Sequence, residues 1–220
     1  VMPLRALLFD LDGTLLDTSG DMGQALNRLL QEEGLPGLPA EQIRPQVSNG
    51  ANALVKLGFG ELPADAHEHL RARFLDLYLE DIARHTHPFP GIEDLLERCL
   101  KQGIAWGIAT NKPWRYTEPL MSHFNFAQSA AVTLCPDHAK PKPDPTMLLL
   151  ACEQIGCAPA DVIYLGDHQR DVECGKRAGM TTIAVGYGFT QSPAEHTTWD
   201  ATFAVQHATE IWPFVQQHHL

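Results

Sequence analysis

The chain has 220 residues, of which 44% are hydrophobic and 20% are charged, and its formal net charge at pH 7 is −11. This length and apolar fraction are sufficient for one large domain, or one domain with a small insertion, around a buried core. The negative charge argues against a nucleic-acid backbone or an anionic membrane as the main partner, but permits a small anionic substrate at a locally positive site.

The first predicted element is a strand over residues 4–9, a short apolar run that ends in the polar loop Asp10-Leu11-Asp12-Gly13-Thr14. The run is consistent with a strand buried on both faces. The next stretch, from about residue 19 to residue 87, has helical periodicity but no convincing strand. Its predicted helices cover residues 22–34, 40–47, 51–57 and 64–82. The pattern therefore predicts an all-helical insertion after the first strand.

Strand and helix alternate after Pro88-Phe89-Pro90-Gly91. Three further strands are predicted over residues 104–109, 162–165 and 181–185, and four helices over residues 92–101, 116–124, 147–155 and 171–178. Such alternation predicts a parallel sheet with helices on both faces. We therefore expect an α/β protein with a doubly wound, Rossmann-like core (residues 1–18 and 88–220). The helical cap domain (residues 19–87) would lie beside the carboxyl ends of the strands, where open sheets bind ligands.

Four polar loops contain the residue types that point to chemistry, and they can meet at one edge of the sheet. They are Asp10 to Thr14, Thr110-Asn111-Lys112-Pro113, Lys140-Pro141-Lys142-Pro143-Asp144-Pro145, and Gly166-Asp167-His168-Gln169-Arg170-Asp171. Carboxylates packed this closely repel one another unless a cation lies among them. Asp10, Asp12 and Asp167 therefore indicate a hard, oxygen-liganded ion, and Mg²⁺ is the usual choice where phosphate is also bound.

Asp10 and Asp12 can take different tasks because alternate residues of a loop point to different sides. Asp10 can attack a phosphorus atom in line and become a phosphoaspartate. Asp12 can protonate the leaving oxygen and later activate water. A lysine and Thr110 would hold the phosphoryl oxygens while charge develops on them.

The four loops together resemble the four motifs of the haloacid dehalogenase superfamily, and within it the phosphatases with a helical cap inserted after the first loop. The resemblance implies that Mg²⁺ is held by the carboxylates of Asp10 and Asp167 and by the backbone carbonyl of Asp12. It also implies that Asp171 orients a metal-bound water or the motif lysine. Dehalogenases of the superfamily lack the second aspartate, so Asp12 favours phosphate transfer.

The motif lysine has two candidates, because Lys140 and Lys142 both begin a Lys-Pro-x-Pro string. In the family this lysine is followed by a helix that ends at a glycine at a fixed distance. Counting back from Gly156 selects Lys142, and leaves Lys140 as an exposed loop charge.

The substrate is less well defined than the chemistry. Ser48-Asn49-Gly50-Ala51, Thr110-Asn111-Lys112-Pro113 and Tyr187-Gly188 resemble bacterial phosphoglycolate phosphatases, which makes 2-phosphoglycolate the first expectation. Trp106-Gly107, Glu118-Pro119 and Cys135-Pro136-Asp137-His138 resemble N-acetylmuramic acid 6-phosphate phosphatases instead. The expected substrate-binding residues are Thr110, Asn111 and Lys142 in the core and Asn49 and Gly50 in the cap. Arg44 in the cap could face the substrate or solvent.

Two rival functions stay open. A sugar-phosphate mutase of the β-phosphoglucomutase type uses the same core, but needs an acid–base group in the cap, where no clear candidate stands. A non-catalytic binding protein with this fold would not need the full set of Asp10, Asp12, Thr110, Lys142 and Asp167.

The sequence also predicts a cytoplasmic protein without a membrane partner. No apolar run reaches the roughly 20 residues of a membrane span, and the first residues lack a signal pattern. The five cysteines form no Cys-x-x-Cys pair, which is typical of reduced thiols. The oligomeric state is not readable from the sequence.

Overall fold

The computed structural model describes residues 3–219 and contains a six-stranded sheet in the order β5-β4-β1-β6-β7-β8. The strands are β1 (Ala6–Phe9), β4 (Ala105–Ala109), β5 (Val132–Leu134), β6 (Val162–Gly166), β7 (Thr181–Val185) and β8 (Phe203–Val205). Every neighbouring pair is parallel. The predicted α/β fold with a parallel sheet is confirmed.

The two edge strands, β5 and β8, are absent from the sequence prediction. Each has only three residues, Val132-Thr133-Leu134 and Phe203-Ala204-Val205. Each also pairs with a single neighbour. A run this short has no recognisable periodicity, and its place in the sheet depends on the strand beside it.

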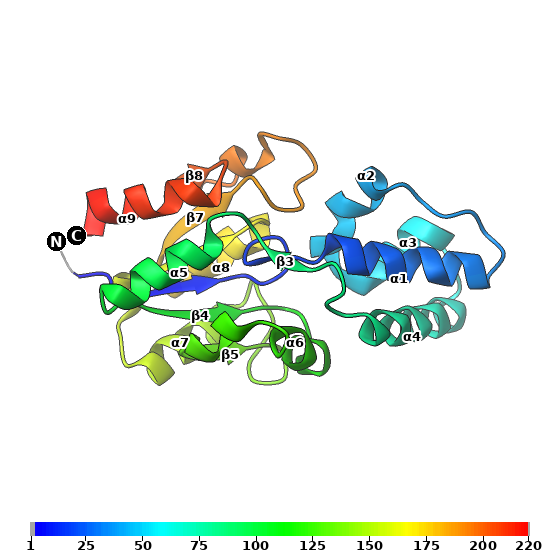
Figure 1. Ribbon diagram of the computed structural model, residues 1–220, viewed down its shortest axis with the longest axis horizontal. Coiled ribbons are helices and arrows are strands. Elements are labelled where there is room, and N and C mark those ends of the chain that lie inside the picture. Colours follow the sequence, from blue (N-terminus) through cyan, green and yellow to red (C-terminus); the bar gives the residue numbers. More distant parts are fainter. Residues whose placement is uncertain (1–2, 220) are drawn as a thin grey trace.

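Helices cover both faces of the sheet (Figure 1). Leu7 and Phe9 of β1 point to one face and pack with α5 (Ile92–Lys101), α6 (Trp114–Met121) and α9 (Ile211–His219). Ala6 and Leu8 point to the other face and pack with α7 (Thr146–Ile155) and α8 (Gln169–Ala178). Alternate residues of β1 are therefore buried on opposite faces, which explains its continuous apolar run. Short 3₁₀ turns join these elements: η2 (Asn125–Ser129), η3 (Pro159–Asp161), η4 (Glu195–Thr198) and η5 (Ala208–Glu210).

A second group of helices lies at the end of the sheet where the strands finish (Figure 1). It consists of α1 (Ser19–Glu32), α2 (Ala40–Ile43), η1 (Arg44–Asn49), α3 (Gly50–Phe59) and α4 (Ala64–Glu80). Leu26 and Leu29 of α1 and Phe74 and Leu77 of α4 are buried in its centre. The predicted helix over residues 40–47 is wrong in one respect: the α-helix ends at Ile43, and a 3₁₀ turn that contains Pro45 follows.

The connections between core and cap run side by side as a two-stranded antiparallel ribbon of β2 (Leu16–Asp17) and β3 (His87–Pro88). Beside it, the buried carboxylate of Asp21 on α1 accepts hydrogen bonds from the backbone N–H groups of His85 and Thr86 and from the Thr86 hydroxyl. This carboxylate ties the first helix of the cap to the segment that returns to the core.

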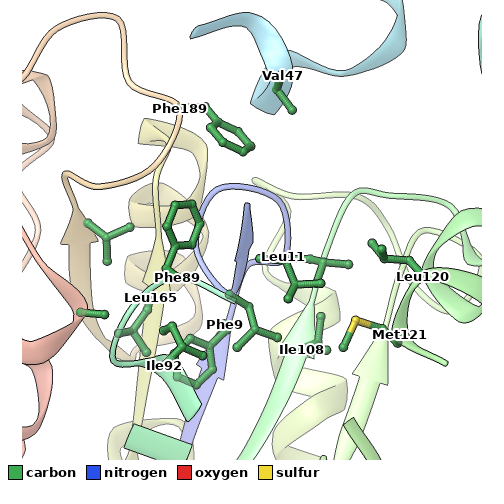
Figure 2. Packing of buried hydrophobic residues seen from close by; sticks show 14 of the residues in the cluster. Phe9, Leu11, Val47, Phe89, Ile92, Ile108, Leu120, Met121, Leu165 and Phe189 are labelled. Carbon is green, nitrogen blue, oxygen red and sulfur yellow. The ribbon is translucent and has the colours of Figure 1, made fainter. Parts of the chain in front are cut away.

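Apolar packing continues across the boundary between core and cap. Figure 2 shows Val47 of η1 close to Phe189, a core residue that follows β7, with Phe89 and the β1 residue Phe9 beneath them. Val47 and Phe189 are both buried. Within residues 3–219, no helix has the length and apolar character needed to cross a membrane.

Candidate active site

The carboxyl ends of the sheet strands bring Asp10, Lys142 and Asp171 into one buried cluster. The ammonium group of Lys142 donates to Asp10 Oδ1 at 3.0 Å, to Asp171 Oδ1 at 2.7 Å and to the Tyr164 hydroxyl at 2.7 Å. Asp10 follows β1, Lys142 follows β5, and Asp171 lies in the first turn of α8. Lys140 is exposed. Of the two candidate lysines, Lys142 is therefore the one that contacts the predicted nucleophile.

Asp167 follows β6 and lies beside this cluster. Its Oδ2 atom accepts hydrogen bonds from the Ser48 hydroxyl at 2.7 Å and the Phe189 backbone N–H at 2.9 Å. Two glycines make room for the carboxylate, because a Cβ atom on Gly13 would lie 2.1 Å from Asp167 Oδ2 and one on Gly188 would lie 2.3 Å from Asp167 Cβ. Gly13 also has a φ of +87°, which few side-chain-bearing residues adopt.

The buried carboxylates are close enough to raise one another's pKa. One carboxylate oxygen each of Asp10, Asp167 and Asp171 lies within 4.8 Å of the others. Burial, and then repulsion from Asp171, raises the pKa of Asp10 to about 6. Burial and repulsion from Asp10 raise the pKa of Asp167 well above its usual range. Burial alone would lower the pKa of Lys142, but Asp10 and Asp171 outweigh it and keep this lysine charged.

This donor set fits a hard metal ion. All three side chains offer oxygen ligands, which divalent cations such as Mg²⁺ prefer. Burial, followed by repulsion between the carboxylates, raises the pKa of Asp10 and of Asp167 even with Lys142 beside them. A bound cation would favour the ionised carboxylates.

Asp12 points its carboxylate away from this cluster. Asp12 Oδ1 accepts hydrogen bonds from the Lys112 ammonium group at 2.8 Å and from the Thr18 hydroxyl at 2.6 Å. The Lys112 ammonium group also lies 4.6 Å from the centre of the Tyr78 ring in the cap. Asp10 and Asp12 therefore have separate partners, as the alternation of side chains along the loop predicts.

Thr110 and Asn111 follow β4, but their side chains do different things. Thr110 is buried, and its hydroxyl accepts a hydrogen bond from the Lys112 backbone N–H at 3.0 Å. The Asn111 amide forms two hydrogen bonds with the backbone of Lys142, one through Oδ1 at 2.8 Å and one through Nδ2 at 2.9 Å. Asn111 therefore fixes the position of Lys142 in addition to lining the site.

A cavity of about 300 Å³ extends from these residues into the cap. Its core wall contains Asp10, Asp12, Thr110, Asn111, Lys112, Lys142, His168 and Arg170, and its cap wall contains Met22, Val47, Ser48, Asn49, Gly50, Arg71, Leu75 and Tyr78. The predicted cap residues Asn49 and Gly50 are thus on the cavity wall. Asp167 and Asp171 lie behind it, where they contact its lining residues.

Three residues have positions that the sequence left open or did not reveal. Arg44 does not line the cavity but joins cap to core, since it pairs with Asp17 at 2.9 Å and lies over the Phe189 ring. His168 caps α8 by accepting from the Arg170 backbone N–H. Ser48, which lies next to the predicted Asn49, was missed as a contact of Asp167, because only the cap's position over the sheet brings the two together.

The arrangement can perform phosphoryl transfer. A carboxylate stands beside a buried ammonium group, a second carboxylate stands apart from it, and both face a cavity that the cap covers. A nucleophile, a separate acid–base group and fixed positive charge are the parts that this chemistry needs.

Comparison with known proteins agrees with this geometry. The family model of haloacid dehalogenase-like hydrolases matches residues 7–185. A solved haloacid dehalogenase-like family protein from Streptococcus pneumoniae superimposes with a TM-score of 0.82 at 22% identity, over 97% of this chain and 99% of that one. This likeness shows the shared fold.

Two curated bacterial proteins are similar over almost their whole length. An N-acetylmuramic acid 6-phosphate phosphatase of Pseudomonas putida is 43% identical, over 96% of this chain and 95% of its own. A phosphoglycolate phosphatase of Xanthomonas campestris is 37% identical, over 94% of this chain and 95% of its own.

Proposed function

Because the chain belongs to the haloacid dehalogenase-like hydrolase family and is a phosphatase, we propose that it hydrolyses a small phosphomonoester through a phosphoaspartate on Asp10. The observation that supports this most directly is the separation of the two acids. Asp10 is bonded to Lys142, whereas Asp12 is bonded to Lys112 and Thr18. One carboxylate can therefore attack while the other handles the proton.

In the first step a carboxylate oxygen of Asp10 attacks phosphorus, and the bond between phosphorus and the ester oxygen breaks. The leaving oxygen takes a proton from Asp12. In the second step Asp12, now a carboxylate, takes a proton from the water that attacks the phosphoaspartate, and the bond between phosphorus and Asp10 breaks. The products are the alcohol and inorganic phosphate, and both aspartates return to their starting states.

Lys142 and Thr110 hold the phosphoryl oxygens in this proposal, and Asn111 and Asp171 keep Lys142 in position. We propose that the metal is Mg²⁺, held by the carboxylates of Asp10 and Asp167 and by the backbone carbonyl of Asp12. When bound, it supplies positive charge that offsets the carboxylates and the charge developing on the phosphoryl group.

The cap, which we assign to residues 19–87, covers the reacting end of the cavity and gives the substrate its outer contacts. Of the two substrates named by the relatives, we propose N-acetylmuramic acid 6-phosphate. The higher identity of the P. putida protein supports this choice, and a 300 Å³ cavity with Val47 and Leu75 on its wall can enclose a sugar ring. Phosphoglycolate, the first expectation from the sequence, is the second candidate, supported by the X. campestris relative.

The test is phosphate release from a panel that contains both esters and glucose phosphates, with Mg²⁺ and with chelator. We expect metal-dependent release, lost by a factor of about a thousand or more in Asp10→Asn and Asp12→Asn. The matched control is Asp65→Asn, an exposed carboxylate on α4, which should retain full activity. Full activity in Asp10→Asn, or release that does not need a metal, would contradict the mechanism. Interconversion of glucose phosphates without phosphate release would favour the mutase.

A further inference from the structure

The cavity contains two cations that the carboxylate chemistry does not use. Arg71 lies on α4 of the cap and Arg170 lies in the first turn of α8 in the core, and both line the cavity that Asp10 and Asp12 also line. We propose that Arg71 and Arg170 bind a second anionic group of the substrate, so that the site selects phosphate esters that also carry a carboxylate. This inference rests on the proposed phosphatase function and deepens it.

The other cavity cations are already neutralised. The Lys142 ammonium group is shared by two buried carboxylates, and the Lys112 ammonium group is bonded to Asp12 at 2.8 Å. Both lysines are almost fully buried, with side chains that are 2% and 7% exposed. Their charge therefore serves the reacting end of the cavity and is not available for a distant part of the substrate.

Arg170 has a different environment. Among the described residues, no carboxylate forms an ion pair with its guanidinium group, which donates a hydrogen bond to the backbone carbonyl of Ser48 at 3.2 Å. The side chain is half-buried at the cavity wall. A guanidinium group has five N–H donors, and a carboxylate can accept two of them in parallel. Arg170 thus retains donors for an anion while it also contacts the cap.

One carboxylate on the same helix, Glu68, competes weakly with a substrate anion for Arg71. Arg71 pairs with Glu68 at 3.3 Å, one turn earlier on the same helix, and the Glu68 side chain is 66% exposed. A surface pair of this kind contributes little free energy, because water and salt screen it. An anion inside the cavity would be less screened and could use the remaining donors of Arg71.

The distribution of acids around the cavity supports the same conclusion. Asp10 and Asp12 are the two carboxylates on the described cavity wall, and both have lysine partners. The chain as a whole carries a formal charge of −11 and therefore repels anions. A locally positive cavity wall would offset this repulsion for an anionic substrate. Both esters named by the relatives carry a carboxylate in addition to the phosphate. Arg71 lies on the cap wall and Arg170 on the core wall, so a bound carboxylate would link the cap to the core.

The test uses substrate pairs that differ in the carboxylate. N-acetylmuramic acid 6-phosphate is compared with N-acetylglucosamine 6-phosphate, and phosphoglycolate with ethyl phosphate. For each pair the ratio of kcat/KM is measured with Mg²⁺ in wild type, Arg71→Gln and Arg170→Gln. We expect the ratio to fall about tenfold or more in each variant, because a charge-assisted hydrogen bond is lost only with the acid ester. Arg71→Lys and Arg170→Lys should restore part of the ratio, since the charge remains.

Arg73→Gln is the matched control, because Arg73 is on the same helix as Arg71 and pairs with Glu32 outside the cavity. It should leave the ratio at the wild-type value. An unchanged ratio in both cavity variants would overturn the proposal, and so would an equal loss on acid and neutral esters, which would place the arginines at the phosphoryl group or in folding.

Binding separates this proposal from the proposed function. Asp10→Asn should not turn over the substrate, so calorimetry can measure the Kd of each ester. The measurement is made in Asp10→Asn alone and in combination with Arg71→Gln or Arg170→Gln. If the wild type releases no phosphate, but Arg71→Gln or Arg170→Gln weakens the binding of acid esters more than that of neutral esters, the phosphatase function is wrong and the anion site is supported. If phosphate is released and the Kd ratio does not change, the anion site fails alone.

Discussion

The space that Gly13 leaves for Asp167 leads to a quantitative prediction for Gly13→Ala. The substitution introduces two perturbations. The backbone has a φ of +87°, and the new Cβ would lie 2.1 Å from Asp167 Oδ2. The left-handed conformation alone costs about 1–2 kcal/mol for an L-residue. The contact forces Asp167 to move away from the Phe189 N–H and the Ser48 hydroxyl, and each lost hydrogen bond of a buried group adds about 1–3 kcal/mol.

Two other glycines separate these terms. Gly156 has a φ of +81°, and a Cβ atom there would have no atom within 4 Å. Gly156→Ala therefore tests the backbone strain without a steric contact. Gly188→Ala tests the steric contact without the backbone strain, because the φ of Gly188 is not left-handed. Its Cβ would lie 2.2 Å from the Gly13 carbonyl oxygen and 2.3 Å from Asp167 Cβ.

We expect Gly156→Ala to lose about 1 kcal/mol, or about 3 °C in Tm, with unchanged kcat/KM. Gly13→Ala should lose at least about 3 kcal/mol, or about 9 °C, together with a fall of about a hundredfold in kcat/KM. Gly188→Ala should also lose activity. Differential scanning calorimetry and phosphate release measure both effects. If Gly13→Ala matches Gly156→Ala in Tm and in activity, Asp167 does not need the space, and the reasoning is refuted.

Three further predictions concern the charges around the site. In metal-free Lys142→Met the loss of the ammonium group leaves buried carboxylates unpaired and should destabilise the fold by about 3–5 kcal/mol at pH 8. Burial raises the pKa of Asp10 to about 6 although Lys142 lowers it, so without Lys142 this pKa rises further. The variant therefore gains more stability than the wild type by protonation as the pH falls, and the loss should be smaller at pH 5 than at pH 8 in urea titrations. Mg²⁺ at about a hundredfold over its Kd should raise the free energy of unfolding by about 2.7 kcal/mol, and calorimetry should show no such increase in Asp167→Asn. Asp21→Ala removes the acceptor for two backbone N–H groups and the Thr86 hydroxyl and should cost about 2–4 kcal/mol in urea unfolding, whereas an unchanged midpoint would show that this tie is dispensable.

The central strands and the reactive loops were predictable from local patterns. Residues 4–9, 104–109, 162–165 and 181–185 are short apolar runs, and each corresponds to a strand buried within the sheet. The loops after such strands must meet at one edge of a parallel sheet, which is why Asp10, Thr110 and Asp167 could be placed together without a structure. The same reasoning missed β5 and β8, since edge strands of three residues have no pattern of their own.

The cap contacts were not predictable, because they depend on how the helices lie over the sheet. Arg71 is one of several charged residues on α4, and Arg73, two positions later, faces Glu32 instead of the cavity. The sequence left open whether Arg44 faces the substrate or solvent. In the structure it contacts Asp17 and Phe189 instead.

The fold class, the family and the residues that we propose for the chemistry could all be read from local runs of residues and from the order of strands and loops along the chain. The packing of the elements sets the partners of these charges: Asp171 shares Lys142 with Asp10, Lys112 pairs with Asp12, and Ser48 of the cap donates to Asp167. Ion pairs and hydrogen bonds act over a few ångströms between residues that are as many as 173 positions apart in the chain. Only the packing of cap against core sets those distances, and with them the shape and charge of the cavity that receives the substrate.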